Sequence, residues 1–374
     1  MSKLEELIQQ HCPDGVEYKP LKDILRIRNG RDYKHLDKGL IPVYGSGGIM
    51  TYVDTPMYSK PSVLIPRKGS IDKLYYVDTP FWNVDTVFYT EIDTSKVVEK
   101  YVYYVLQKEH LEKLNTAGGV PSLTQGVLNE VLIPVPPLPV QEEIVRILDS
   151  FAELQAELQA ELQKRIQQYN YYRDNLLSFE GRTDVEWKKL GEIGKVCMCK
   201  RILKDQTSST GDIPFFKIGT FGGSADAYIS KELFEEYVKK YSYPKKGDIL
   251  ISAAGTIGRT VVFDGTPSYF QDSNIVWLKH DESVVLNSYL RYIYSLNPWA
   301  ISTGGTIARL YNDNILNAVI PVPPLTEQQR IVDILDRFNT LTTDITAGLP
   351  AEIEARRKQY EYYRDQLLTF KQKA

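Results

Sequence analysis

The chain carries one pattern of residues twice, and this repetition limits the fold more than any other feature. The hexapeptide IPVPPL at Ile133–Leu138 recurs at Ile320–Leu325, 187 positions later. Farther on, Tyr169–Phe179 recurs as Tyr360–Phe370, 191 positions later. Solenoid repeats are only roughly 20–45 residues long, so a period of this length indicates two whole half-proteins. In a chain of 374 residues, each half is long enough to bury a core of its own.

A long amphipathic helix is expected in each half, after the proline-rich hexapeptide. Apolar residues recur about every 3.6 positions over 147–179, and a matching stripe runs over 334–370. Two matched stripes of this length favour pairing of the helices as an antiparallel coiled coil, with packing of each helix on its own domain as the alternative. Gly348 and Pro350 interrupt the second stripe, and Pro350 suits the first turn of a restarted helix.

The rest of each half reads as a mixed α/β domain. Apolar runs bounded by turn residues predict strands over 62–66, 84–89, 248–253 and 275–278, and longer runs predict helices over 97–114 and 284–296. Weaker repeats relate Val63–Ile71 to Ile249–Ile257, and Thr116–Gly119 to Ser302–Gly305. The predicted fold is α+β: two mixed α/β domains in a pseudo-twofold arrangement, separated by two long helices packed as an antiparallel coiled coil. The predicted boundaries are 1–138 and 181–325 for the domains, and 139–180 and 326–374 for the helices.

Composition favours a cytoplasmic protein with no membrane attachment. No stretch approaches 18 consecutive apolar residues, and the first residues lack the apolar core of a signal peptide. The three cysteines, Cys12, Cys197 and Cys199, are too few for a disulfide framework and fit a reducing compartment. They are expected to act as small buried apolar side chains.

Motifs of catalytic type are weak in this sequence. The run Pro13-Asp14-x-x-Glu17-x-Lys19 resembles a nuclease motif, but two residues between the acids are too few for the hairpin that such a metal site needs. The segment Asn297–Ala300 resembles part of an amino-methyltransferase motif without its partner glycine loop. Four scattered histidines give neither a zinc site nor a catalytic triad, and no Walker A loop is present. We therefore expect no catalytic residues, no metal and no cofactor in this chain.

Charge is distributed in the same way in both domains, although the chain as a whole has a net charge of −3. Residues 19–73 contain 11 Lys and Arg against 5 Asp and Glu, and residues 187–263 contain 13 against 8. The segments that follow, 74–130 and 264–318, are net acidic. Basic segments suit contact with phosphate, and Arg also reads guanine edges, so both domains are candidates for DNA binding. A solvated basic face without a partner is the alternative.

Glycine-rich polar loops within or near these segments supply the candidate DNA-binding residues. Glycine lets a backbone approach phosphate closely, while neighbouring Ser, Thr, Lys or Arg donates hydrogen bonds. Plain turns explain the glycines equally well, and a structural ion pair is the alternative role for Arg309. The candidates are Arg67, Lys68, Ser70 and Lys73 in the first half, and Thr256, Arg259 and Arg309 in the second.

The duplicated motifs together resemble the DNA specificity subunit of type I restriction-modification systems. The resemblance rests on the repeated IPVPPL, the Gln-x-x-Ile-Val-x-Ile-Leu-Asp that follows it and the Tyr-x-Tyr-Tyr-Arg-Asp-x-Leu-Leu-x-Phe helix ends, and it covers essentially the whole chain. It implies two target-recognition domains that each read one half of a bipartite, asymmetric site in double-stranded DNA. It also implies a non-catalytic chain whose helices act as spacers.

The same resemblance implies the partners. Two modification subunits would supply S-adenosylmethionine and methylate adenine, and two restriction subunits would add ATP- and Mg-dependent translocation and cleavage. We expect the helix-end tyrosines Tyr169, Tyr172, Tyr360 and Tyr363 to lie at helix or subunit interfaces, because tyrosine combines an apolar ring with a polar tip. Two alternatives stay open: a duplicated coiled-coil adaptor that binds only proteins, and a self-sufficient DNA enzyme. The basic segments oppose the first and the weak catalytic motifs oppose the second.

Overall fold

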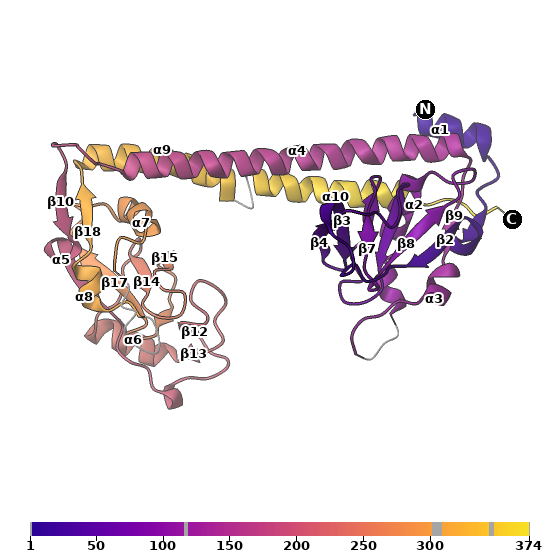
Figure 1. Cartoon of the computed structure of the whole chain (residues 1–374). Coiled ribbons are helices and arrows are strands. Elements are labelled where there is room, and N and C mark those ends of the chain that lie inside the picture. Colours follow the sequence, from indigo (N-terminus) through magenta and orange to yellow (C-terminus); the bar gives the residue numbers. More distant parts are fainter. Residues whose placement is uncertain (1, 116–118, 301–308, 344–347, 374) are drawn as a thin grey trace. The chain divides into compact units, whose positions relative to one another are not determined.

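A computed structural model describes residues 2–115, 119–300, 309–343 and 348–373 (Figure 1). The chain forms two compact units, which we call unit 1 (Met1–Glu161 with Ala351–Ala374) and unit 2 (Leu162–Pro350). The chain passes from one unit to the other twice, between Glu161 and Leu162 and between Pro350 and Ala351, and each of these boundaries falls within a helix. Among the helices of the described residues, none has the length and apolar character needed to cross a membrane.

Unit 1 contains the N-terminal domain and the C-terminal helix of the chain. Its elements are α1 (Lys3–His11), β1 (Tyr18–Pro20), η1 (Leu21–Asp23), β2 (Leu25–Asn29), β3 (Lys38–Gly45), β4 (Gly48–Val53), β5 (Ser62–Pro66), β6 (Tyr75–Val77), β7 (Trp82–Asn83), β8 (Val87–Ile92), α2 (Glu99–Lys108), η2 (Leu111–Leu114), α3 (Gln125–Asn129), β9 (Leu132–Pro134), the first part of α4 (Leu138–Leu177) and most of α10 (Leu349–Leu367).

Unit 2 contains the second domain and the rest of α4. Its elements are β10 (Glu186–Lys189), α5 (Leu190–Ile193), β11 (Gly194–Cys197), η3 (Lys204–Gln206), β12 (Ile213–Phe216), β13 (Tyr228–Ile229), α6 (Lys231–Lys240), β14 (Ile249–Ser252), β15 (Thr260–Val262), β16 (Tyr269–Phe270), β17 (Ile275–His280), α7 (Asn287–Ser295), α8 (Asn312–Leu316), β18 (Val319–Val322) and α9 (Leu325–Thr343).

Both units contain the same three sheets in the same order. The strand order β2-β8-β5-β6 in unit 1 matches β11-β17-β14-β15 in unit 2, and β4-β3-β7 matches β13-β12-β16. The two-stranded pairs β1-β9 and β10-β18 also match. In each unit one strand pair is parallel, β3 with β7 and β12 with β16. The sequence repeat is therefore a repeat of topology, which confirms a two-domain α+β fold.

The strand predicted over 62–66 is β5, and every residue in it is buried. It pairs with β8 and β6 on its two edges, and because successive side chains point to opposite faces, burial of every residue means that both faces are covered, which explains why its apolar run is continuous. In unit 2 the equivalent strand β14 is likewise buried throughout.

A buried glutamine ties the start of each long helix to its domain. In unit 1 the Nε2 of Gln141 donates to the carbonyls of Lys96 (3.1 Å) and Pro136 (2.7 Å), and its Oε1 accepts from the amide of Val98 (2.8 Å). The equivalent Gln328 in unit 2 forms the same three bonds, with the carbonyls of Val284 and Pro323 and the amide of Leu286. In each unit the buried glutamine thus joins the first turns of the long helix to the proline-rich motif and to the segment before α2 or α7.

Each unit also holds a pair of antiparallel helices (Figure 1). In unit 1 α10 packs along the first part of α4, and the Tyr363 and Phe151 rings stack with centroids 5.5 Å apart. In unit 2 α9 packs along the second part of α4, and the Tyr172 and Phe338 rings stack at 5.4 Å. The helix break predicted at Gly348 and Pro350 is confirmed, since α10 begins at Leu349 and holds Pro350 in its first turn.

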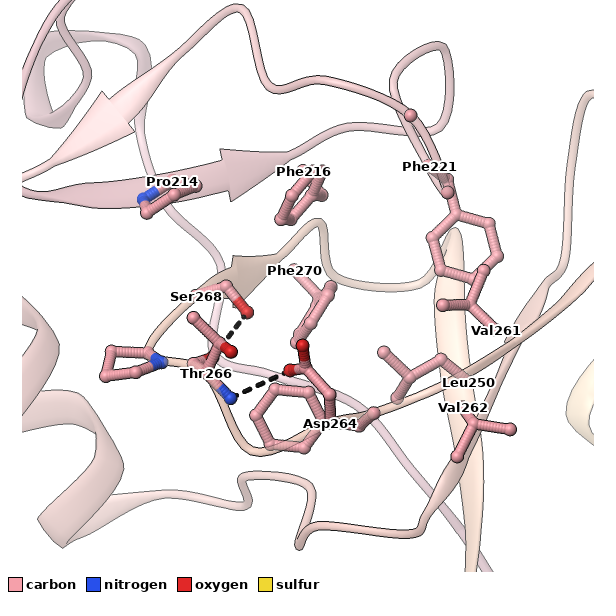
Figure 2. Close-up of a pocket in the computed structure, with 14 residues that line it drawn as sticks. Pro214, Phe216, Phe221, Leu250, Val261, Val262, Asp264, Thr266, Ser268 and Phe270 are labelled. Carbon is pink, nitrogen blue, oxygen red and sulfur yellow. Dashed lines mark hydrogen bonds between the residues drawn. The ribbon is translucent and has the colours of Figure 1, made fainter. Parts of the chain in front are cut away.

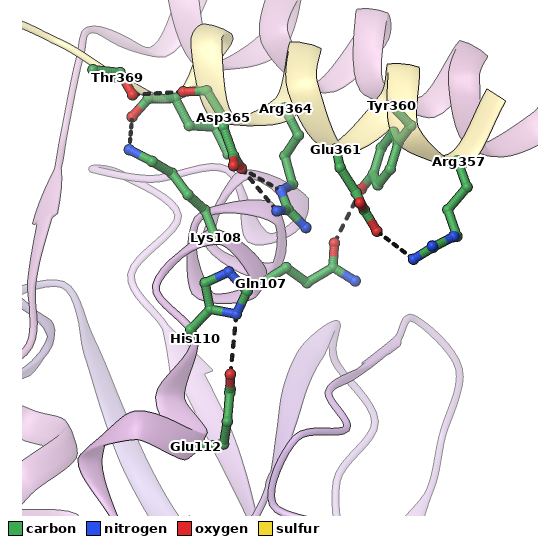
Figure 3. A network of polar contacts seen from close by, with 11 residues as sticks. Gln107, Lys108, His110, Glu112, Arg357, Tyr360, Glu361, Arg364, Asp365 and Thr369 are labelled. Atoms are coloured by element: carbon green, nitrogen blue, oxygen red, sulfur yellow. Dashed lines mark hydrogen bonds and ion pairs between the residues drawn. The ribbon is translucent and has the colours of Figure 1, made fainter. Parts of the chain in front are cut away.

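The C-terminal segment completes unit 1. The amide of Val16 donates to the carbonyl of Lys371 (2.8 Å), and the amide of Lys373 donates to the carbonyl of Val16 (2.9 Å). Figure 3 shows α10 beside α2, where the hydroxyl of Tyr360 donates to the Oε1 of Gln107 (3.1 Å). Residues at opposite ends of the sequence therefore share one core.

Candidate nucleic-acid interface

The candidate residues of unit 1 lie on the loop between β5 and β6. Lys68 and Lys73 are exposed, and Ser70 is half-buried. Gly69 has φ +79°, a left-handed conformation that suits glycine, and a Cβ placed there would lie 3.3 Å from the Oγ of Ser46. Two glycine-rich loops that are far apart in sequence, 45–48 and 67–70, are therefore neighbours.

Arg67 is held more firmly than a free surface cation. Its guanidinium lies 5.3 Å from the centre of the Phe88 ring, and its Nη1 donates to the Oδ1 of Asn29 (3.3 Å). Its buried Nε has no hydrogen-bond partner within the described part of the chain. The sheet thus fixes the direction of this side chain, while the next residue, Lys68, extends into solvent.

A groove of about 660 Å³, which we call groove 1, lies beside this loop. It opens where the parallel strands β3 and β7 end, and the amide of Arg67 donates to the carbonyl of Thr86 (2.9 Å) at its edge. Its charged lining residues are Asp32, Lys34 and Asp85. The full lining is Asp32, Tyr33, Lys34, Gly45, Ser46, Gly47, Met50, Val84, Asp85 and Thr86.

Two of the candidate residues of unit 2, Thr256 and Arg259, lie between β14 and β15, which corresponds to the loop between β5 and β6 in unit 1, and Arg309 lies before α8. Thr256 and Arg259 are exposed on the loop after β14, and the Nη2 of Arg259 donates to the carbonyl of Gly222 (3.2 Å). Arg309 is half-buried, and its Nη2 donates to the carbonyl of Ser273 (2.6 Å). The glycine-rich repeat predicted at 116–119 and 302–305 lies almost wholly outside the described residues.

A second groove of about 570 Å³, groove 2, opens where the parallel strands β12 and β16 end. It therefore occupies the same place in the repeated topology as groove 1. Among the described residues, four cations line it against one carboxylate, Asp272. The cations are Arg201, Lys204, Lys217 and Arg309. Sequence reasoning found Arg309 and missed the other three as individuals, although all three belong to the basic segment 187–263.

A third pocket, of about 350 Å³, also lies in unit 2 and is mostly apolar (Figure 2). The rings of Phe216 and Phe270 stack in it with centroids 5.8 Å apart. Its charged lining residue is Asp264, whose carboxylate accepts a bond from the amide of Thr266 (2.8 Å). Unlike the two grooves, this pocket has no Lys or Arg among its described lining residues, so it is not a candidate for contact with the DNA backbone.

The helix-end tyrosines occupy different environments. Tyr169 and Tyr360 are half-buried and pack against the cores of unit 2 and unit 1, while Tyr172 and Tyr363 form the helix–helix stacks described above. The most exposed members of the motif are Tyr171 (67%) and Tyr362 (61%), which sequence reasoning missed. Because these two face away from the apolar stripe, helix periodicity could have identified them.

Residues with a catalytic or metal-binding appearance in the sequence have structural roles. The carboxylate of Glu17 pairs with the ammonium group of Lys19 (3.1 Å); Glu17 directly precedes β1, and Lys19 lies within that strand. No group of three or more His, Cys, Asp or Glu side chains in the described ranges could hold a metal ion. All three cysteines are free and buried, as predicted.

The architecture is therefore that of a duplicated DNA-recognition chain, in which each repeat presents a groove with charged residues in its lining and a basic loop beside its central sheet. A model of the type I restriction modification DNA specificity domain matches the chain twice, over residues 13–168 and 183–355. The chain belongs to this family of DNA specificity subunits, which are non-catalytic.

Relatives of this chain match it over three quarters of its length or more. A putative type I restriction enzyme specificity subunit of Haemophilus influenzae is 48% identical, with 98% of each chain covered. The specificity subunit of the enzyme EcoR124I/EcoR124II of Escherichia coli is 36% identical over 75% of this chain and 73% of its own. These relatives support DNA recognition over an adaptor that binds only proteins.

Solved structures show the same fold at low sequence identity. The S subunit of a type I restriction-modification system from M. genitalium is 15% identical, covers 95% of this chain and 96% of its own, and has a TM-score of 0.58. A chain from a study of complex assembly and conformational transition in the type I system is 16% identical, covers 95% and 97%, and has a TM-score of 0.59.

Proposed function

We propose that each unit reads one half of a bipartite DNA site, through its groove and the adjacent basic loop. The observation that carries this proposal is the presence of a groove at the same topological position in both units, with different charges in its lining. Groove 1 presents Asp32, Lys34 and Asp85, whereas groove 2 presents four cations and Asp272. Different linings select different bases, so the two half-sites are unlike and the whole site is asymmetric.

A mobility-shift assay tests this division of labour. The double variant Arg67→Ala/Lys68→Ala should weaken binding through the first half-site, and Arg259→Ala should weaken binding through the second. Loss of a base contact should weaken binding by about 1–3 kcal/mol only when the half-site it reads is intact, whereas loss of a phosphate contact should weaken binding to all sequences alike. Duplexes in which one half-site at a time is scrambled therefore distinguish base contacts from phosphate contacts. Each measurement is made with and without the modification subunit. Unchanged binding in both variants would remove these residues from the interface.

The partners of the chain follow from the same repeat. We propose that two modification subunits dock on the chain, one on the exposed surface around Tyr171 and one on the equivalent surface around Tyr362. Two restriction subunits would then join the resulting complex. In each copy the exposed ring meets the next tyrosine edge-on, at 5.6 Å for Tyr171 with Tyr172 and at 5.4 Å for Tyr362 with Tyr363. Two equal surfaces support two copies of one partner. S-adenosylmethionine would then be held by the modification subunits, and ATP with Mg by the restriction subunits.

Mass photometry of mixtures with the modification subunit tests this stoichiometry. Tyr171→Ala should leave one modification subunit bound per chain, and Tyr171→Ala/Tyr362→Ala should leave none or bind far more weakly. Tyr172→Ala and Tyr363→Ala remove a ring from a helix–helix stack, so we expect them to lower stability as well. Full occupancy in the double variant, with folding intact, would exclude these tyrosines from the docking surfaces.

A further inference from the structure

We propose that Arg201 reads a guanine in the half-site bound by unit 2, and that Asp272 orients it. This inference rests on the proposed function, because it assigns a base to groove 2. Arg201 follows β11 and Asp272 follows β16, so the two residues reach the groove from separate strands.

The ion pair between them leaves the reading face of the arginine open. The Nε of Arg201 donates to the Oδ2 of Asp272 at 2.9 Å, and within the described chain this is the one hydrogen bond that Arg201 makes. The side chain of Arg201 is 67% exposed, whereas that of Asp272 is 17% exposed. The carboxylate is therefore shielded in the groove wall, and both Nη groups of the arginine are free to donate outward.

Asp272 is held in place by its neighbours. Its Oδ2 also accepts a bond from the hydroxyl of Ser273 (3.2 Å), and Ser273 has φ +59°, which is unfavourable for a residue other than glycine. The carbonyl of Ser273 accepts from Arg309 (2.6 Å), and the carbonyl of Asp272 accepts from the amide of Asn274 (2.7 Å). Strained turns persist where surrounding contacts hold them, and they are common at binding sites.

The free donors match one base better than the others. Guanine presents two acceptors, N7 and O6, side by side in the major groove, and an arginine fork bonds both at once. Adenine places a donor at N6 beside N7, so it opposes the second Nη. The carboxylate of Asp272 fixes the plane of the guanidinium before DNA arrives, which lowers the entropy lost on binding.

The other cations of groove 2 suit phosphate contact. Lys217 is paired with Asp226 (2.8 Å) at the groove edge, and Lys204 forms no ion pair with any described residue. The side chain of Arg201 is largely exposed, so its removal should cost little folding stability and leave the domain folded. A DNA-binding assay on variants is therefore straightforward to interpret.

The test uses the complex of the chain with its modification subunits and a duplex carrying the site that the wild-type complex methylates. Each guanine of the half-site bound by unit 2 is replaced in turn by 7-deazaguanine, which lacks the N7 acceptor. We expect one replacement to weaken binding of the wild type by about 10-fold and to have no further effect on Arg201→Ala. Asp272→Asn changes the positioning residue, so it should reduce the loss of binding that 7-deazaguanine causes at the same position.

Two controls separate base reading from general attraction. Lys239→Ala removes an equal charge from the end of α6, outside the groove lining. Each 7-deazaguanine replacement should weaken binding of this variant as much as it weakens binding of the wild type. Lys204→Ala should weaken binding to all sequences alike and reduce the salt dependence. If Arg201→Ala keeps the wild-type sensitivity at every guanine, the inference is wrong while the proposed function stands. If the wild-type complex binds no duplex, both are wrong.

Discussion

The substitution Gln328→Met tests the bond set that ties the long helix α9 to the second domain. Gln328 is fully buried and makes three hydrogen bonds, at 2.8 Å to Pro323, 3.0 Å to Val284 and 2.9 Å from Leu286. Methionine has a similar length and volume, so the change creates little cavity. Each lost bond costs about 1 kcal/mol, and burying two carbonyls and one amide without partners adds to this. We expect the free energy of unfolding of unit 2 to fall by about 3–4 kcal/mol.

Guanidinium unfolding followed by tryptophan fluorescence measures this loss. Trp277 and Trp299 are buried in the second domain, so their emission reports on unit 2. The neighbouring Gln329 is exposed and bonds to Asp333 within the same helix, which makes Gln329→Met a matched control with an expected effect below about 0.5 kcal/mol. Equal stability of the two variants would refute the role assigned to the buried glutamine. The equivalent change Gln141→Met should destabilise unit 1 in the same way.

Three further predictions concern the pH dependence of stability, the spacer and the thiols. Hydrogen bonds from Arg146 and then Lys3 lower the pKa of Glu143 to about 2, so its stabilising effect is present above the unfolded value of 4.5 and is lost as pH falls toward 2. Glu143→Gln should therefore cost about 1–2 kcal/mol at pH 7 and almost nothing at pH 2 in urea unfolding. Residues 152–163 of α4 are three consecutive copies of Ala-Glu-Leu-Gln. A fourth copy lengthens the helix by about 6 Å, and methylation-site sequencing should show unchanged half-sites about one to two base pairs farther apart; an unchanged gap would exclude a spacer role. Burial raises the pKa of Cys199 to about 12, and the other two cysteines are also buried, so a thiol reagent should label none in the native chain and all three in denaturant.

Sequence alone predicted those parts of the fold whose signals are local or repeated. The buried strand β5 and the two long helices follow from apolar runs and helical periodicity, and Pro350 marks the start of α10 because its ring suits a first turn. The repeat then predicted that both halves share one topology. The spacing of motifs along the chain was sufficient for these conclusions.

The reading surface depends on contacts that sequence spacing does not reveal. Arg201 and Asp272 are 71 positions apart and meet because β11 and β16 end at the same groove. Gly69 and Ser46 are neighbours because two loops turn at one edge of unit 1. Charge counting found the basic segments, but only the strand order shows which cations face a groove.

Methylation-site sequencing of cells that express this chain with its modification subunits tests the central claim most directly. The account predicts one motif with two unlike halves separated by a gap of fixed length. Arg201→Ala should change one position in one half, and Arg67→Ala/Lys68→Ala should affect only the other half. A single uninterrupted motif, or a change in both halves from a variant in one unit, would contradict the assignment of one half-site to each unit.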